Sequence, residues 1–212
     1  MTGEKESSHM STESRRSFLR NKCLATAGAA GSALFAMVSG RTRIARASET
    51  AGLATTQSTS PEQRLRELGI ELPPPPRPVG VYVPAVRTGN ILFTAGHTPR
   101  GPDGSPLLGK VGVDMSVEDA HAAARIAGLN LLSTVRNTLG SLDNVVQLVK
   151  VLGMVNCAPD FGQQPQVING FSELLVEVFG EERGRGGRAA VGMASLPANQ
   201  PVEVEAIFEV RG

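Results

Sequence analysis

The 212-residue sequence has no tryptophan, one tyrosine, three histidines and two cysteines. Beyond residue 47 the cysteine is Cys157 alone, so an oxidising compartment could offer this part of the chain no intrachain disulfide. We interpret Cys157 as a small, half-buried thiol rather than a nucleophile, because no base and orienting group accompany it. Stability must therefore come from the hydrophobic core.

Residues that bind metals or nucleotides are equally scarce. Beyond residue 47 the histidines are His97 and His121, and a spacing of two between Asp119 and His121 does not place two ligands on one helix face. The stretch "GSPLLGK" at 104–110 begins like a phosphate loop, but Val111 stands where a magnesium-binding Ser or Thr is needed. From these residues we expect neither a metal site nor a nucleotide-binding loop.

Basic residues are concentrated at the N-terminus. Residues 1–47 hold eight Lys/Arg and three Asp/Glu, which leaves 13 basic and 17 acidic residues, a net charge of −4, for the rest of the chain. Aromatic residues make up only 4% of the sequence, so we expect no basic, aromatic groove of the kind that binds single strands. Composition therefore disfavours a nucleic-acid partner.

The N-terminal basic residues form part of an export signal. Arg15 and Arg16 are followed by Phe-Leu, then by the uncharged, Ala/Gly-rich segment 23–40 and by a small-residue cleavage site after Ala47. Residues 1–47 resemble a twin-arginine signal peptide, which implies passage through the twin-arginine export machinery to the periplasm. The 18 uncharged residues approach the ~20 that span a bilayer. Their composition and the cleavage site nevertheless favour a removed signal over a permanent membrane anchor.

The remaining chain reads as one domain. Residues 48–60 are rich in Thr, Ser and Ala and predict a flexible linker, and 61–212 predict an α+β domain. A short helix over 61–72 is followed by "PPPPRP" at 73–78, which we interpret as an extended spacer rather than a docking motif. Strands over 80–86 and 91–95, with a turn at 87–90, predict a hairpin.

Two amphipathic helices and three more strands follow. Ser116 opens a long helix with an Ala-rich stripe that runs to Leu139, and Pro165 starts a second helix with a stripe that ends at Val178. Strands are expected over 145–155, which reads as a buried central strand, and over 189–194 and 202–210. The order ββαβαββ predicts two helices packed on one face of a sheet.

Four single residues stand out against this pattern. Tyr82 lies in the first expected strand, Asn169 on or beside the apolar stripe of the second helix, Arg188 at the beginning of the penultimate strand, which is otherwise uncharged, and Glu203 on the last strand. A charge entering an apolar run is costly unless it meets an anion. From the residues alone, a surface ion pair of Arg188 with Glu203 or Glu205 is as plausible as a ligand site.

Longer stretches carry a family resemblance. "VGVYVPAVRTGNILFTAGHTP" at 79–99, "INGFSELL" at 168–175 and "GRAAVGMASLPANQPVEVEAIFEV" at 187–210 together resemble the reactive intermediate deaminase family, RidA, also called YjgF or endoribonuclease L-PSP. The match runs from about Pro61 to Val210 and further resembles the longer branch described as chorismate-mutase-like. It implies a mixed sheet and a homotrimer with ligand clefts between its subunits.

The resemblance also implies site residues and a reaction. Arg188 stands where the family has an arginine that holds a small carboxylate substrate, and the backbone N–H of Ala190 supplies a further donor. Glu203 matches the glutamate that positions the hydrolytic water, while Tyr82 and Asn169 match cleft-lining residues. The implied reaction hydrolyses 2-imino or enamino acids to 2-oxo acids and ammonium without a cofactor.

The second-strand loop departs from the family pattern. Many members have Ser-Gly before a Gln that precedes Pro, whereas this chain reads Ala95-Gly96-His97-Thr98-Pro99. A hydroxyl is lost from the expected cleft and His97 adds a titratable group. The departure keeps open an alternative function, a non-catalytic carboxylate-binding or chaperone-like trimer, with endoribonuclease activity as a third reading.

Overall fold

The computed structural model describes residues 59–101 and 104–212. The predicted signal peptide and nearly all of the predicted linker lie outside the described residues. Among the helices that are described, none is long and apolar enough to cross a membrane. The principal elements are α2 (Pro61–Glu67), β1 (Ala85–Thr88), β2 (Ile91–Thr94), α3 (Val117–Leu139), β3 (Val145–Asn156), α4 (Gln164–Phe179), α5 (Glu181–Gly184), β4 (Gly187–Met193) and β5 (Val202–Val210), with short 3₁₀ turns at Leu142–Asn144 and Pro197–Asn199.

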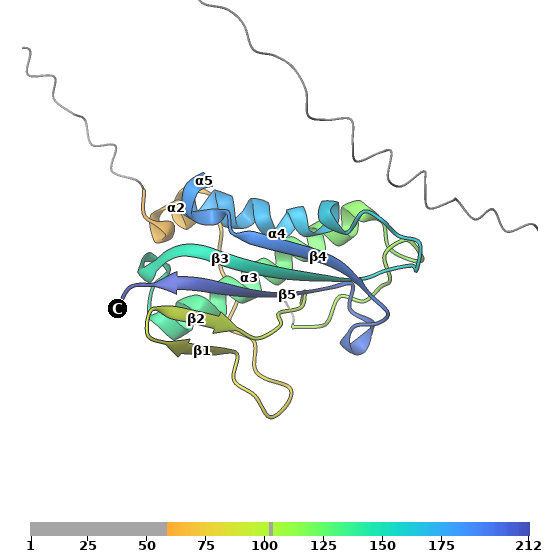
Figure 1. Cartoon of the computed structure of the whole chain (residues 1–212), viewed down its shortest axis with the longest axis horizontal. Helices are drawn as coiled ribbons and strands as arrows, with labels where there is room; N and C mark the ends of the chain where they lie inside the picture. Colours follow the sequence, from red (N-terminus) through yellow and green to blue (C-terminus); the bar gives the residue numbers. More distant parts are fainter. Residues whose placement is uncertain (1–58, 102–103) are drawn as a thin grey trace, which may run out of the picture. The chain divides into compact units, whose positions relative to one another are not determined.

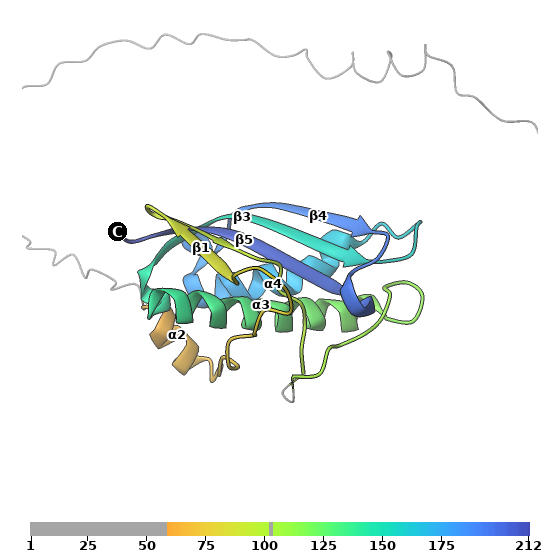
Figure 2. The same ribbon diagram turned by 90° about the horizontal axis from the view of Figure 1, so that it is seen from below.

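The strands form one mixed sheet in the order β1-β2-β5-β3-β4. The pair β3 and β4 is parallel and the other pairs are antiparallel. Helices α3 and α4 cover one face of this sheet, and the two layers are seen edge-on in Figure 2. The predicted α+β class and the ββαβαββ order are confirmed, and the sheet is mixed as the resemblance implied (Figure 1).

The core lies between the helices and the sheet, where small residues permit close packing. Gly128 of α3 faces Leu174 and Phe171 of α4 so closely that a Cβ at position 128 would overlap the Leu174 side chain. The predicted α4 stripe is fully buried, and most of the α3 stripe is buried with it. Burial of aliphatic side chains on this scale is the main source of stability for a domain whose described residues contain no disulfide.

The first strand differs from its prediction. β1 begins at Ala85 rather than at residue 80, and a two-residue turn at Gly89 and Asn90 connects it to β2. Pro84 has no N–H to donate to the ladder, although its carbonyl still accepts a hydrogen bond from the Ala95 N–H at 2.9 Å. Tyr82 therefore lies in an exposed, bent segment before the strand, not in the strand itself.

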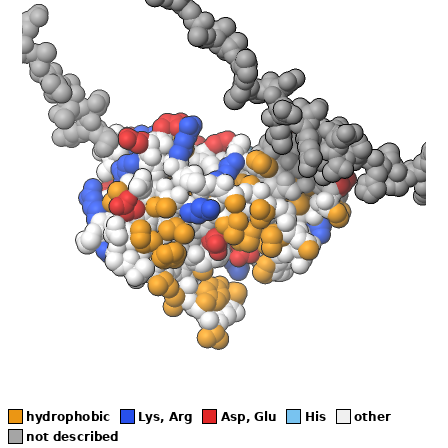
Figure 3. Space-filling model, viewed as in Figure 1, with side chains coloured by type: hydrophobic (Ala, Val, Ile, Leu, Met, Phe, Trp, Pro, Cys, Tyr) orange, Lys and Arg blue, Asp and Glu red, His pale blue; other side chains and the backbone are white. Residues whose placement is uncertain are grey.

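Strand β3 is only half buried, which corrects the prediction of a buried central strand. Buried residues are interspersed with exposed or partly exposed ones along the strand, which lies one strand from the sheet edge. The open face, which the helices do not cover, carries exposed apolar side chains, including Val86, Phe93 and Val191. Figure 3 looks onto this face and shows hydrophobic side chains gathered over the strands. A continuous aliphatic run does not distinguish core from an uncovered apolar face.

Residues 61–78, which precede the first strand, are attached to the helical layer. Helix α2 ends at Glu67 instead of residue 72, because Gly69 adopts a left-handed conformation with a φ of 64°. Leu65 is buried as expected, whereas Leu68 is exposed. The following polyproline segment is held to α3 by the Ser133 hydroxyl, which donates to the Pro73 carbonyl at 2.5 Å.

Candidate functional site

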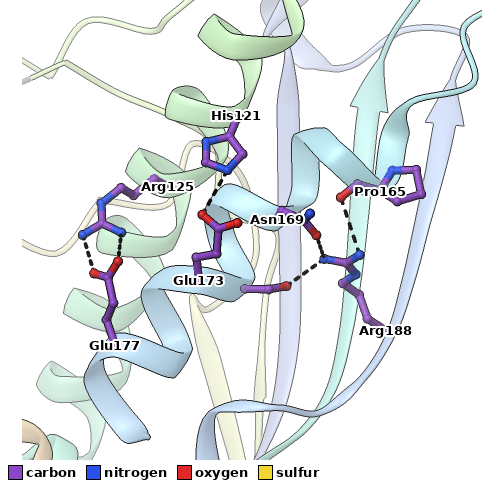
Figure 4. Close-up of polar contacts among 8 residues, drawn as sticks. His121, Arg125, Pro165, Asn169, Glu173, Glu177 and Arg188 are labelled. Atoms are coloured by element: carbon purple, nitrogen blue, oxygen red, sulfur yellow. Dashed lines mark hydrogen bonds and ion pairs between the residues drawn. The ribbon is translucent and has the colours of Figure 1, made fainter. Parts of the chain in front are cut away.

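Arg188 lies in β4, with its guanidinium turned toward α4 (Figure 4). Its Nη1 donates to the Asn169 Oδ1 and to the Ser172 Oγ, both at 2.9 Å. Its Nη2 makes a longer contact of 3.5 Å with the Pro165 carbonyl. Three neutral oxygens from one helix thus orient the guanidinium without neutralising its charge.

A carboxylate partner for Arg188 is missing among the described residues. The ion pairs there join His121 to Glu173, Arg125 to Glu177, Arg136 to Glu62 and Arg185 to Glu181. The alternative that Arg188 pairs with Glu203 or Glu205 is therefore wrong. Within the same part of the chain, its Nε–H also donates to no protein acceptor. The Nε and Nη2 groups can thus bind a planar anion by donating two parallel hydrogen bonds to it.

Helix α4 is fixed in place by close packing against α3. A Cβ on Gly170 would overlap the backbone carbonyl of His121, so glycine is required where the two helices meet. The ion pairs of Glu173 with His121 and Glu177 with Arg125 join the outer faces of the same helices (Figure 4). This support fixes Asn169 and Ser172 beneath Arg188. Ser172 was not predicted, although its position three residues after Asn169 places both on one helical face.

Glu203 borders a cavity of about 110 Å³ that Arg188 does not line. Tyr82 and His97 line the same cavity, together with the polyproline segment and the loop after β2. The carboxylate lies against Gly96, where a Cβ would collide with it. Among the described residues no side chain donates a hydrogen bond to this carboxylate, so it can hold a water molecule or a reacting group.

The environment of Glu203 favours its protonated form. Burial, reinforced by the neighbouring Glu205 carboxylate, raises the pKa of Glu203 above its ordinary value of 4.5. A carboxylate with a raised pKa is a better proton acceptor than an ordinary surface glutamate. The electrostatics of the cavity therefore suit a group that assists the attack of water.

His97 is a buried, hydrogen-bonded side chain. Its Nδ1 contacts the Ala95 carbonyl and its Nε2 the Thr134 hydroxyl, each at 2.8 Å. A carbonyl oxygen only accepts, so Nδ1 carries the proton, and the neutral ring accepts from Thr134 through Nε2. Burial lowers the pKa of His97 below its ordinary value of 6.5, an effect that the hydrogen bond to Ala95 partly opposes. The ring forms part of the cavity wall, with both nitrogens occupied.

The predicted site residues fall into two groups within one chain. Arg188, Asn169 and the partly buried Ala190 lie where β4 meets α4, whereas Glu203, Tyr82 and His97 border the cavity. Arg188 pairs with Val151, and Val151 with the buried Ala206, so the Arg188 side chain points to the helix-covered face. Glu203 lies three residues from Ala206 along β5 and therefore points to the open face.

Metal ligands do not converge in the part of the chain that the structure describes. Groups of three or more His, Cys, Asp or Glu side chains suited to a metal ion are not found there. Cys157 is buried, more deeply than expected, and its Sγ lies 3.8 Å from the Gln164 Nε2.

Known proteins share both the sequence and this architecture. Protein TCP17 of Trypanosoma cruzi is 41% identical over 146 residues, which cover 69% of this chain and 91% of that protein. The solved structure of Atu1372 from Agrobacterium tumefaciens, a protein of unknown function, is 41% identical with a TM-score of 0.64 and covers 71% of this chain and 94% of its own.

A putative endoribonuclease of Shewanella oneidensis MR-1 is 32% identical with a TM-score of 0.68, over 71% of this chain and 99% of its own. The family model described as YjgF/chorismate mutase-like, putative endoribonuclease, matches residues 62–209. This match covers nearly the whole described domain, from α2 to the end of β5. The chain therefore belongs to the YjgF/chorismate mutase-like family.

Proposed function

We propose that the protein is a hydrolytic deaminase that converts small 2-imino or enamino acids to 2-oxo acids and ammonium. In this proposal Arg188 and the backbone N–H of Ala190 hold the substrate carboxylate. Glu203 positions and activates the water, and Tyr82, Asn169 and His97 shape the surrounding cleft. Family membership supports the general reading, and the arrangement of these residues supports the specific one.

The observation that carries the proposal is the environment of the Arg188 guanidinium. Its guanidinium is oriented by Asn169 and Ser172, yet among the described residues it meets no anion. Edge strands also leave backbone N–H groups without a partner strand, and β4 is such an edge. Together these donors can bind a carboxylate at a fixed distance from the strand.

A complete site requires a second copy of the chain. Arg188 and Glu203 lie on opposite faces of the sheet, so one subunit cannot readily direct both at a small substrate. The open face, which carries Glu203 together with apolar residues such as Phe93 and Val191, is suited to burial against another subunit. We propose a homotrimer in which Arg188 of one subunit faces Glu203 of the next.

The proposed chemistry needs no cofactor. Water adds to the carbon of the C=N bond as the Glu203 carboxylate accepts its proton, and the resulting amino alcohol releases ammonia to leave the 2-oxo acid. The nitrogen takes up the protons that the water and Glu203 supply, so no electrons are transferred to an external group. Holding the carboxylate and the water in a fixed geometry is the main catalytic contribution.

The test is ammonia release from 2-iminopropionate that is generated freshly in the assay. We expect acceleration by the wild-type protein and a loss of about 100-fold or more in kcat/KM for Arg188→Ala, because charge-assisted hydrogen bonds contribute roughly 1.5–3 kcal/mol each. Arg66→Gln, on the exposed side of α2, removes the same charge elsewhere and should retain full activity. Equal inactivity of the wild type and Arg188→Ala rejects the deaminase proposal.

A second candidate function is binding of small carboxylates without turnover. It is favoured by Ala95, which supplies no hydroxyl to the cavity that it lines, and by His97, whose ring nitrogens are both occupied. Calorimetry with 2-oxobutyrate and benzoate separates the two. Binding that Arg188→Ala abolishes, without turnover of the imine, supports the binder. Endoribonuclease activity is the third candidate, and the excess of acidic residues beyond residue 47 counts against it.

We also propose that the protein is exported to the periplasm. Residues 1–47 carry the features of a twin-arginine signal, with Arg15 and Arg16 as the pair that the export machinery would recognise. Replacement of both by lysine should retain the protein in the cytoplasm, as measured by cell fractionation. Unchanged periplasmic protein in that variant rejects this route.

A further inference from the structure

The cavity beside Glu203 has two arginines among its lining residues. Arg77 comes from the polyproline segment and Arg100 from the loop after β2. The two also line a second hollow, of about 520 Å³, so both arginines border the two spaces. Neither residue was included in the predicted site.

Both cations lack an anionic partner in the described part of the chain. Arg100 donates from Nη1 to the Gly104 carbonyl at 3.2 Å, and neither Arg77 nor Arg100 forms an ion pair there, even with Glu203. His97 contributes no charge while its ring is neutral. Among the described residues that line the cavity, the charged side chains are thus two arginines and one glutamate.

The polyproline segment fixes the position of Arg77. Pro76 and Pro78 flank it and also line the cavity, and each proline ring restricts the backbone φ to about −65°. The segment is attached to α3 by the hydrogen bond between Ser133 and the Pro73 carbonyl. Little conformational entropy is then lost from the backbone when Arg77 binds a ligand.

We infer that Arg77 and Arg100 bind a second anionic group of the substrate, so that the protein acts on 2-imino dicarboxylic acids. This inference rests on the proposed function. Arg188 holds the carboxylate next to the imine, and the cavity of the neighbouring subunit binds the distal carboxylate. Hydrolysis then follows the same course, in which water replaces the imine nitrogen and ammonia leaves, to give a 2-oxo dicarboxylate.

Calorimetry with 2-oxoglutarate and 2-oxobutyrate tests this inference directly, since the first compound has two carboxylates and the second has one. We expect the wild type to bind 2-oxoglutarate at least about tenfold more tightly, in line with a charge-assisted hydrogen bond. Arg77→Gln combined with Arg100→Gln should abolish this preference and leave the affinity for 2-oxobutyrate unchanged. Arg77→Lys with Arg100→Lys, which keeps both charges, should retain part of the preference.

Controls separate this inference from the proposed function. Arg66→Gln, exposed on α2, should leave both affinities unchanged. Arg188→Ala should weaken both compounds in parallel. Equal binding of the two compounds by the wild type, or a preference that survives the double Gln substitution, overturns the inference and leaves the proposed function intact. Failure of the wild type to bind either compound overturns both.

Discussion

The carboxylate of Glu203 lies against the α-carbon of Gly96, so closely that a methyl group at position 96 would overlap it. The absence of a side chain at Gly96 therefore leaves the space that the Glu203 carboxylate, the proposed general base, occupies. Gly96→Ala should displace the carboxylate and reduce kcat by about 10- to 100-fold, in the range of effects from ångström-scale misplacement. In a double-mutant cycle Gly96→Ala should have little effect on Glu203→Gln, because both act on the same group. Full additivity would contradict this role.

The raised pKa of Glu203 predicts a pH dependence of the rate. Its ionised form is the proton acceptor, so kcat/KM should rise with pH through an apparent pKa above 4.5, and Glu203→Gln should remove this limb of the profile. A profile with its midpoint at or below 4.5 would count against the assignment.

The same pKa shift links Glu203 to stability. A group whose pKa is raised by folding stabilises the folded state below its unfolded pKa, and this contribution is lost as the pH rises through the folded value. Relative to wild type, Glu203→Gln should therefore gain in Tm as the pH rises above 4.5. Identical pH dependence of Tm in the two proteins would show that burial does not penalise the ionised carboxylate.

The lowered pKa of His97 predicts the opposite dependence of stability on pH. Its pKa is lowered on folding, so its stabilising contribution is present above 6.5 and is lost as the pH falls through the folded value. Wild-type Tm should fall more steeply than that of His97→Gln as the pH is lowered from 7 toward 5. Measuring Thr134→Val in parallel checks the partner of Nε2, whose loss should destabilise the protein at neutral pH.

The contact between α3 and α4 makes a prediction that does not depend on function. Gly170→Ala would place a methyl group against the His121 carbonyl and should reduce the free energy of unfolding by about 1–3 kcal/mol. Alanine otherwise favours a helix over glycine, so a loss in a denaturant titration isolates the steric cost. Gly162→Ala is the control, because position 162 opens onto empty space and should change stability little.

Helices marked by hydrophobic periodicity and by a capping residue were predictable from the sequence. The α4 stripe from Val167 to Val178 and the cap at Ser116 specify local structure through spacing and side-chain type, and both are confirmed. The first strand was misplaced because the apolar run at 79–83 resembles a strand, whereas Pro84 limits the ladder to the residues after it.

Site features that depend on long-range packing could not be predicted in the same way. The contact of His97 with Thr134 joins residues 37 positions apart, and nothing in their local sequences indicates it. Arg77 reaches the Glu203 cavity only because the polyproline segment packs against α3. Of the two side chains that accept hydrogen bonds from Arg188, Asn169 was predicted. Ser172 was not, although it follows Asn169 at helical spacing.

The central claim is that each site combines Arg188 of one subunit with Glu203 of another. Mixed oligomers of Arg188→Ala and Glu203→Gln subunits, formed by coexpression of differently tagged chains, test it most directly through ammonia release from 2-iminopropionate. Each variant alone should have only a small residual activity, and the coexpressed mixture should regain about a quarter of the wild-type activity, because about one interface in four joins two intact halves. Mixed oligomers that assemble but remain inactive would contradict the shared site.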